Sequence, residues 1–168
     1  YFEPENAHAA LAVLRAAGYR VAVARANADD AEPARPLCCG RTFLAAGLVD
    51  EAKHEARRVV AALAPQVARG AVVVGLEPSC LLTLRDEFLV MGLGEAAQRL
   101  AAQALLFEEF LAREHHAGRL KLSLRVATRA MLVHGHCHQK AFGAMPPVLE
   151  VLRLIPGAEV TPIESSCC

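Results

Sequence analysis

A short apolar run at residues 130–133 leads directly into three histidines and a cysteine within residues 134–138. The run has the length and apolar character of a buried strand, and a helix-compatible segment follows it. Since the carboxyl ends of parallel strands open into a crevice where loops meet a ligand, this stretch predicts an α/β protein with its chemistry at a strand end. Three other segments place cysteines in similar positions: Cys38-Cys39-Gly40, Glu77-Pro78-Ser79-Cys80 and Ser165-Ser166-Cys167-Cys168.

The spacing of apolar residues predicts the elements around these segments. Helical periodicity indicates helices over residues 6–17, 48–63, 95–117 and 139–154, and short apolar runs indicate strands over residues 19–24, 71–76, 130–133 and 158–163. We expect Asn6 to cap the first helix, Pro65 to end or kink the second, and Pro162 to make the last strand an edge. Glycines follow three of the four helices, at positions 18, 118 and 157, and we expect Gly18 to supply a left-handed stop. We also expect Gly40 to permit the sharp turn that two adjacent cysteines need if they are to face one site.

The two ends of the chain have the same order of elements. Residues 6–39 and 139–168 each run helix, glycine, strand and cysteine pair. We therefore expect parallel sheets flanked by helices in two diverged Rossmann-like pseudo-repeats, about 1–118 and 119–168, truncated at both ends. By this alignment the counterpart of Cys137 would precede Tyr1, and the counterpart of Cys80 would follow Cys168.

Charge and composition argue against several classes of protein. Lys plus Arg equals Asp plus Glu at 18 each, so neither nucleic acid nor an anionic membrane surface is an expected partner. No apolar run approaches the roughly 18–20 residues of a membrane span, and the first residues lack the charged-then-apolar order of a signal peptide. We therefore expect a soluble, cytoplasmic chain. Its 168 residues, at 54% apolar content, are enough to bury a sizeable core.

The cysteines predict a metal centre. Adjacent cysteines rarely bridge each other, and thiolates are soft ligands that select iron–sulfur clusters, zinc or copper. Zinc is the main alternative to a cluster, although the C-x-x-C pairs typical of structural zinc are absent from the sequence. Direct thiol redox chemistry at either vicinal pair is a third possibility. The expected ligands are Cys38, Cys39, Cys80, Cys137, Cys167 and Cys168.

The residues around these cysteines receive supporting roles. His136 and His138 flank Cys137, and alternation along an extended segment would direct both away from the side that Cys137 faces. We therefore expect them to orient or support the ligand, with His134 packed nearby and Glu77 serving as a loop acceptor rather than a catalytic base. Surface positions are expected for His8, His54, His115 and His116.

Four motifs together resemble the cysteine-rich CCG domain of heterodisulfide-reductase-like proteins, and the resemblance covers nearly the whole chain. It is strongest to the version at the carboxyl end of FAD-linked D-lactate or 2-hydroxyacid dehydrogenases of the glycolate-oxidase type. The motifs are Cys38-Cys39-Gly40-Arg41, the run from Val74 to Glu87, His134-Gly135-His136-Cys137-His138-Gln139-Lys140, and Glu164-Ser165-Ser166-Cys167-Cys168.

The family pattern is a single cysteine, a vicinal pair and a C-x-x-C, given twice, and in heterodisulfide-reductase relatives it holds iron–sulfur clusters. Here the first C-x-x-C is incomplete, because Glu77 and Thr83 stand on either side of Cys80. A single site shared between the copies therefore fits better than two clusters. By position, Cys38 and Cys39 match the first pair, Cys80 one member of the first C-x-x-C, Cys137 the leading cysteine of the second copy, and Cys167 and Cys168 the second pair.

The resemblance implies an iron–sulfur electron-transfer module, of 4Fe–4S type, within a flavin-dependent 2-hydroxyacid dehydrogenase. Such a chain is part of an oxidoreductase and passes electrons from a flavoprotein domain or subunit to a quinone or cytochrome. FAD is expected outside this chain, since no glycine-rich dinucleotide fingerprint follows its strands. Membrane association would be peripheral and through partners. The alternative from another class is a zinc-stabilised scaffold that docks subunits without redox chemistry.

Overall fold

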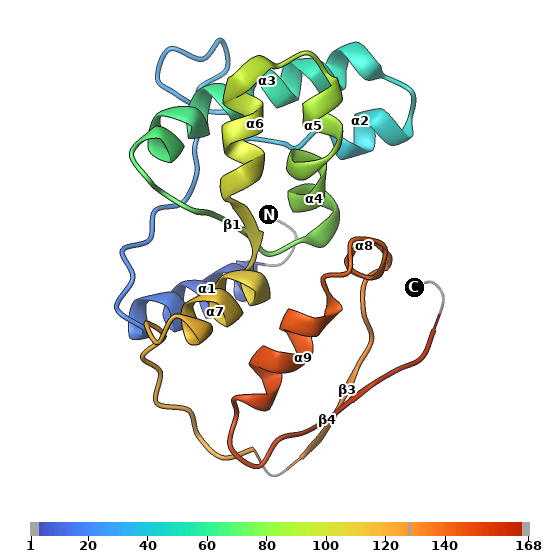
Figure 1. The fold of residues 1–168 in the computed structure, drawn as a ribbon. Coiled ribbons are helices and arrows are strands. Elements are labelled where there is room, and N and C mark those ends of the chain that lie inside the picture. Colours follow the sequence, from blue (N-terminus) through green and yellow to red (C-terminus); the bar gives the residue numbers. More distant parts are fainter. Residues whose placement is uncertain (1–3, 128, 166–168) are drawn as a thin grey trace. The chain divides into compact units, whose positions relative to one another are not determined.

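The computed structural model describes residues 4–127 and 129–165 and has the expected α/β class (Figure 1). The chain divides into two compact units. The central unit is Ala22–Leu105, and the terminal unit is the described part of Tyr1–Val21 and Leu106–Cys168. The predicted boundary between two copies near residue 118 stays a prediction.

In the central unit, α3 (Val49–Ala68) packs against α6 (Gly94–Gln103) and against α2 (Arg41–Ala45). The helix α4 (Pro78–Arg85) packs on α6 and on α5 (Glu87–Val90), whose Phe88 is fully buried. Burying one such aromatic side chain contributes about 2–3 kcal/mol. This packed set of helices is the base on which the site of this unit is built.

The predicted helix at residues 48–63 is confirmed, and because α3 continues to Ala68, Pro65 does not end it. The alternative, that Pro65 kinks the helix, stays a prediction. A proline inside a helix leaves the carbonyl four residues earlier without its usual donor. Here that carbonyl belongs to Ala61, and the side-chain amide of Asn27 donates to it at 3.1 Å. A loop residue thus replaces the backbone donor that Pro65 lacks.

The helix predicted over residues 95–117 is also wrong as one element. It is divided into α6 and α7 (Phe107–His116) by β2 (Ala104–Leu106), which joins β1 (Val73–Gly75) in a two-stranded sheet. The stretch satisfies helical periodicity, but β1 offers it backbone partners, and tertiary pairing overrides local propensity. The strand β1 confirms the centre of the run predicted at 71–76.

In the terminal unit, β3 (Ala130–Val133) pairs in parallel with β4 (Glu159–Pro162), so the predicted strands at 130–133 and 158–163 are confirmed. Val133 lies opposite Pro162, and the Ile163 N–H continues the ladder by donating to the Val133 carbonyl at 2.8 Å. Two helices connect the strands, α8 (Cys137–Ala141) and α9 (Met145–Arg153), where a helix over residues 139–154 was expected. The four elements form a β-α-α-β crossover with α9 against β4.

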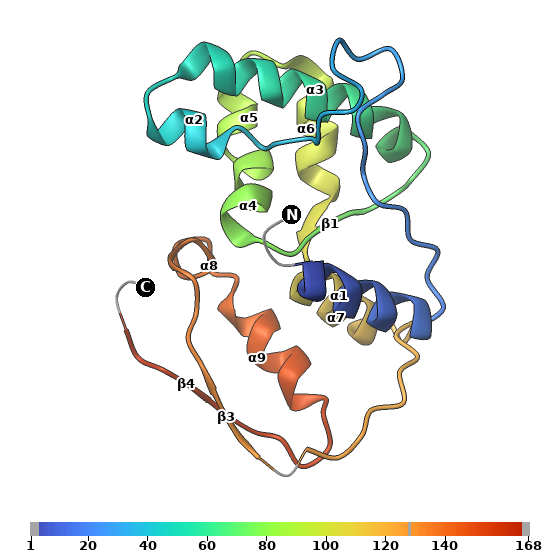
Figure 2. The same cartoon turned by 180° about the vertical axis from the view of Figure 1, so that it is seen from behind.

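The helix α1 (Pro4–Ala16) lies beside α7 in both views (Figures 1 and 2). It starts two residues before Asn6, so Asn6 is not its cap. It ends at Ala16, and Gly18, two residues later, has the expected left-handed φ of 87°. The strand predicted at residues 19–24 is wrong. That segment is extended, but no described strand pairs with it, and Val23 is 66% exposed.

Within the described residues, no helix combines the length and the apolarity that crossing a bilayer requires.

Candidate functional site

The first vicinal cysteine pair lies in the central unit, just before α2. The turn that follows it depends on Gly40, whose φ of 78° is left-handed, as the sequence predicted. Gly40 is also packed against α3, since a Cβ there would lie 2.9 Å from the Ala52 carbonyl oxygen. Its N–H donates to the Cys38 sulfur at 3.4 Å. Glycine at this position therefore fixes both the direction of the chain and its distance from α3.

The junction between β1 and α4 brings Cys80 to the same region. Glu77 caps α4, and its carboxylate accepts hydrogen bonds from the N–H groups of Ser79 at 3.1 Å and Cys80 at 2.5 Å. Pro78 occupies the start of the helix, where no N–H is needed. The expectation that Glu77 is an acceptor agrees with these contacts. Cys80 lies in the first helical turn with its side chain exposed.

The sulfurs of Cys39 and Cys80 lie 3.1 Å apart, and either thiol could donate in this hydrogen bond. A bond from Cys80, assisted by the Arg41 N–H and opposed by burial, lowers the pKa of Cys39 to about 7. The pKa of Cys80 is strongly raised, first by its bond to Cys39 and then by burial and the nearby negative charges. The Glu77 carboxylate beside Cys80 disfavours a negative charge on that thiol, which favours Cys39 as the thiolate of the pair and Cys80 as the donor.

Glu77 supplies one of these negative charges. Burial opposes its ionisation, but the N–H groups of Cys80 and Ser79 outweigh burial and hold the pKa of the carboxyl below its ordinary value. The carboxylate therefore stays ionised next to Cys80 at neutral pH.

All three thiols line one cavity of about 330 Å³ in the central unit. A metal bound at about 2.3 Å to two thiolates in tetrahedral geometry would hold their sulfurs about 3.8 Å apart, so Cys39 and Cys80 would need to separate by less than about 1 Å. Thiols are the donors that a thiolate-bound metal or an iron–sulfur cluster requires. Most other lining residues are apolar: Ala24, Leu37, Val59, Leu63, Val73, Leu76, Leu81 and Leu84.

A second junction, between β3 and α8 in the terminal unit, presents Cys137. His136 caps α8: its Nδ1 accepts the His138 N–H at 3.1 Å, and its own N–H donates to Gln139 Oε1 at 3.1 Å. The alternation expected for residues 136–138 is therefore wrong, because a helix begins at Cys137. The Cys137 sulfur lies 3.9 Å from Nδ1 of both histidines, whose rings stack 5.2 Å apart.

These three side chains form a compact group, with one ligand atom from each within 4.8 Å of the others. His136 is the least suited of them to hold a metal, because the lone pair of its Nδ1 is directed at the His138 N–H and a neutral ring then carries its proton on Nε2. A metal bound at Nδ1 would therefore remove the cap of α8, and a metal bound at Nε2 would displace the proton from that nitrogen. The geometry favours an orienting role for His136.

A polar cluster that the sequence did not reveal joins the end of β4 to this junction. Lys140 Nζ donates to the carbonyl and the hydroxyl of Ser165 at 2.8 and 2.7 Å, and the same hydroxyl lies 2.8 Å from His134 Nε2. The parallel register could have indicated it, since residues 134 and 163 follow the paired Val133 and Pro162. His134 thus holds the chain after β4.

The structure brings together three of the six predicted ligands, Cys38, Cys39 and Cys80. Cys137 belongs to the other unit, and Cys167 and Cys168 lie outside the described residues. The complete set of six ligands stays a prediction. The expected surface positions of His8, His54, His115 and His116 are confirmed.

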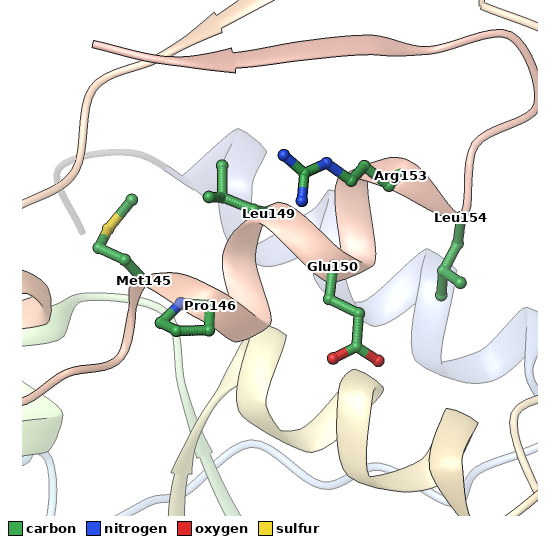
Figure 3. A pocket seen from close by; sticks show the side chains of 6 residues that line it. All are labelled: Met145, Pro146, Leu149, Glu150, Arg153 and Leu154. Carbon is green, nitrogen blue, oxygen red and sulfur yellow. The ribbon is translucent and has the colours of Figure 1, made fainter. Parts of the chain in front are cut away.

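An open cavity of about 450 Å³ lies along α9 in the terminal unit (Figure 3). Its lining contains no thiol, and Glu150 forms an ion pair with His116 at 2.7 Å. This surface therefore offers no group of ligands. The six lining residues are Met145, Pro146, Leu149, Glu150, Arg153 and Leu154.

Among known proteins, the chain is similar to the C subunit of the anaerobic glycerol-3-phosphate dehydrogenase from Escherichia coli K12 and from Escherichia coli O157:H7. Each is 31% identical to it over 132 residues, which cover 78% of this chain and 33% of the relative. The chain therefore spans about one third of the length of these curated relatives. No protein-family model matches the chain, and no solved structure matches it.

Proposed function

We propose that this chain is an electron-transfer module of a dehydrogenase and that its cysteines hold an iron–sulfur cluster. The observation that carries the proposal is the convergence of Cys38, Cys39 and Cys80 on one cavity of the central unit. Three thiols from two segments far apart in the sequence are more than a small apolar core requires, and they are the donors that such clusters use. A bound cluster would accept and release single electrons.

The residues around the thiols are suited to this role. The lowered pKa of Cys39 makes a thiolate available near neutral pH, and thiolates are the form that binds metal. The N–H groups of Gly40 and Arg41 donate to the sulfurs of Cys38 and Cys39, and such bonds tune the potential of a cluster. The lining around the thiols is mostly apolar, and the polarity of its surroundings also tunes the potential of a cluster.

We further propose Cys137, Cys167 and Cys168 as ligands, with Glu77, His136 and His138 in supporting positions. The support is the resemblance of their motifs to the CCG domain. Cys137 lies in the first turn of a helix after a strand, as Cys80 does. The cluster type we propose is 4Fe–4S.

The whole protein, we propose, oxidises a secondary alcohol. The relatives are named for glycerol 3-phosphate, and the motif resemblance is to dehydrogenases of 2-hydroxyacids. Both substrates are oxidised at a carbon that bears a hydroxyl group and becomes a ketone, which releases two electrons and two protons. A flavoprotein partner in the cytoplasm would take up the electron pair, and this module would pass electrons singly to a quinone or cytochrome.

The test is iron and sulfide analysis with visible and electron paramagnetic resonance spectra of the intact, anaerobically purified protein. We expect bound iron and a reducible cluster signal, and loss of more than half of the iron in Cys38→Ser, Cys39→Ser and Cys80→Ser. His54→Ala, at an exposed histidine of α3, is the matched control and should keep its iron. Stoichiometric zinc with no iron after reconstitution would refute the cluster and favour the zinc-stabilised docking scaffold.

A further inference from the structure

A buried guanidinium lies beneath the loop that leads to Cys38. Arg58 projects from α3 and is only 6% exposed. Its Nη2 donates to the carbonyls of Glu32 and Arg35 at 3.1 and 3.0 Å, and its Nη1 donates to the carbonyl of Pro36 at 3.2 Å. Three backbone carbonyls of one loop thus converge on a single side chain.

The remaining donors of Arg58 bind carboxylates. Its Nε lies 3.1 and 3.0 Å from the two oxygens of Asp30, and Nη1 also donates to Glu55 at 3.2 Å. Arg35 donates to the other oxygen of Glu55 at 2.6 Å. All five N–H groups of the Arg58 guanidinium therefore have acceptors, and the carboxylates of Asp30 and Glu55 are each paired with an arginine.

This network holds the cysteine pair from one side. Pro36, whose carbonyl is fixed, precedes Cys38 by two residues, and the intervening Leu37 lines the cavity. On the other side, Gly40 is packed against Ala52. Ala52 and Arg58 belong to the same helix, α3, so one rigid element fixes the chain both before and after the pair.

We propose that Arg58 is a positioning residue that sets the separation of the Cys38-Cys39 pair from Cys80. Cys80 is placed independently, by the junction of β1 and α4, so the approach of Cys39 depends on how α3 holds the loop. Lysine cannot replace arginine here, because an ammonium has three donors and no planar fork. The purpose of this positioning rests on the proposed function. The separation of the thiols that it sets does not require a bound metal.

The test uses the intact protein, reduced and metal-free, with Cys137, Cys167 and Cys168 replaced by Ser. Phenylarsine oxide is the probe, because trivalent arsenic binds two thiols only when they are close together. We expect Arg58→Lys to weaken its binding about tenfold or more, which corresponds to about 1.4 kcal/mol. Arg57→Lys, at an exposed neighbour on the same helix, should bind as the parent does. Cys80→Ser reports how much of the binding uses Cys80.

Circular dichroism shows whether the variants fold. If Arg58→Lys does not fold, arsenical binding is measured in Asp30→Asn instead. That variant removes one acceptor of the same network and keeps the guanidinium. Unchanged arsenical binding in a folded Arg58→Lys protein, or in Asp30→Asn where that variant decides, would overturn the positioning role. Absence of iron from the parent protein would refute the proposed cluster but leave this result intact, so the two failures are distinguishable.

Discussion

The junctions β1–α4 and β3–α8, which lie in different units of the chain, both present a cysteine at the start of a helix. Each has a glycine packed against a side chain of the following helices, a capping side chain that accepts N–H groups, and a cysteine in the first helical turn. They differ in what the cysteine meets. Cys80 meets another thiol, that of Cys39, beside an anionic cap, whereas Cys137 meets two imidazoles, one of which is the cap.

The difference shows that the backbone motif presents a cysteine but does not set its chemistry. The thiols of Cys39 and Cys80 together keep one proton. The Cys80 thiol stabilises a thiolate at Cys39, whereas a second thiolate at Cys80 would be repelled by the first and by the Glu77 carboxylate. Within its own unit, Cys137 lies beside the imidazoles of His136 and His138. The neighbours that tertiary structure supplies therefore separate two locally similar sites.

The largest expected difference concerns the two packed glycines. At Gly75 an added Cβ would lie 2.6–2.7 Å from Cδ1 and Cβ of the buried Leu81, so Gly75→Ala should lower the free energy of unfolding by about 2–3 kcal/mol. At Gly135 the added atom would meet the thioether of Met145, a flexible chain end, so Gly135→Ala should cost less than about 1 kcal/mol. Denaturant unfolding followed by circular dichroism measures both, and equal costs would contradict the argument.

The next prediction tests the shared proton. Cys80→Ala removes the donor to Cys39, so the pKa of Cys39 should rise from about 7 by more than about one unit. Cys80→Ser keeps a hydroxyl donor and should change it less, and Cys137→Ser should not change it. The pH dependence of alkylation at Cys39, resolved by peptide mass spectrometry on metal-free protein, measures the shift. A Cys39 pKa that is the same in all three variants would show that Cys80 is not the donor.

Removal of the caps should have a smaller effect. Glu77→Ala and His136→Ala each delete the acceptor of N-terminal N–H groups and should each destabilise the fold by about 1 kcal/mol. Glu77→Gln is the matched variant that keeps an acceptor, and it should cost less than Glu77→Ala. Thermal unfolding compares them. A loss of stability confined to one junction would break the structural parallel between the two.

The smallest expected effect is the acid dependence of the two junctions. The folded-state pKa of Glu77 lies below its ordinary value of 4.5, so its contribution is present above about pH 4.5 and is lost as the pH falls through the lower folded value. Stability measured from pH 6 downward should therefore fall less steeply in Glu77→Gln than in the parent. The cap of α8 is an imidazole and not a carboxylate, so that junction has no corresponding carboxylate contribution.

Much of the local structure could be predicted because it depends on short-range chemistry. Gly40 and Gly18 adopt the left-handed conformations expected, and the β-branched and apolar runs at β1 and β3 form strands. The failures involve partners distant in sequence. Pro65 stays within α3 because Asn27 reaches Ala61, and the stretch 104–106 pairs with β1 instead of continuing a helix.

The amino-acid sequence alone establishes the α/β class, the glycines that turn the chain and the cysteines that carry its chemistry, because these follow from backbone freedom, side-chain periodicity and ligand softness. The folded chain selects which cysteines share a cavity, which thiol keeps the proton, and which buried arginine holds the loop before Cys38. Those outcomes depend on distances between segments far apart in the chain. No local pattern of residues encodes such distances.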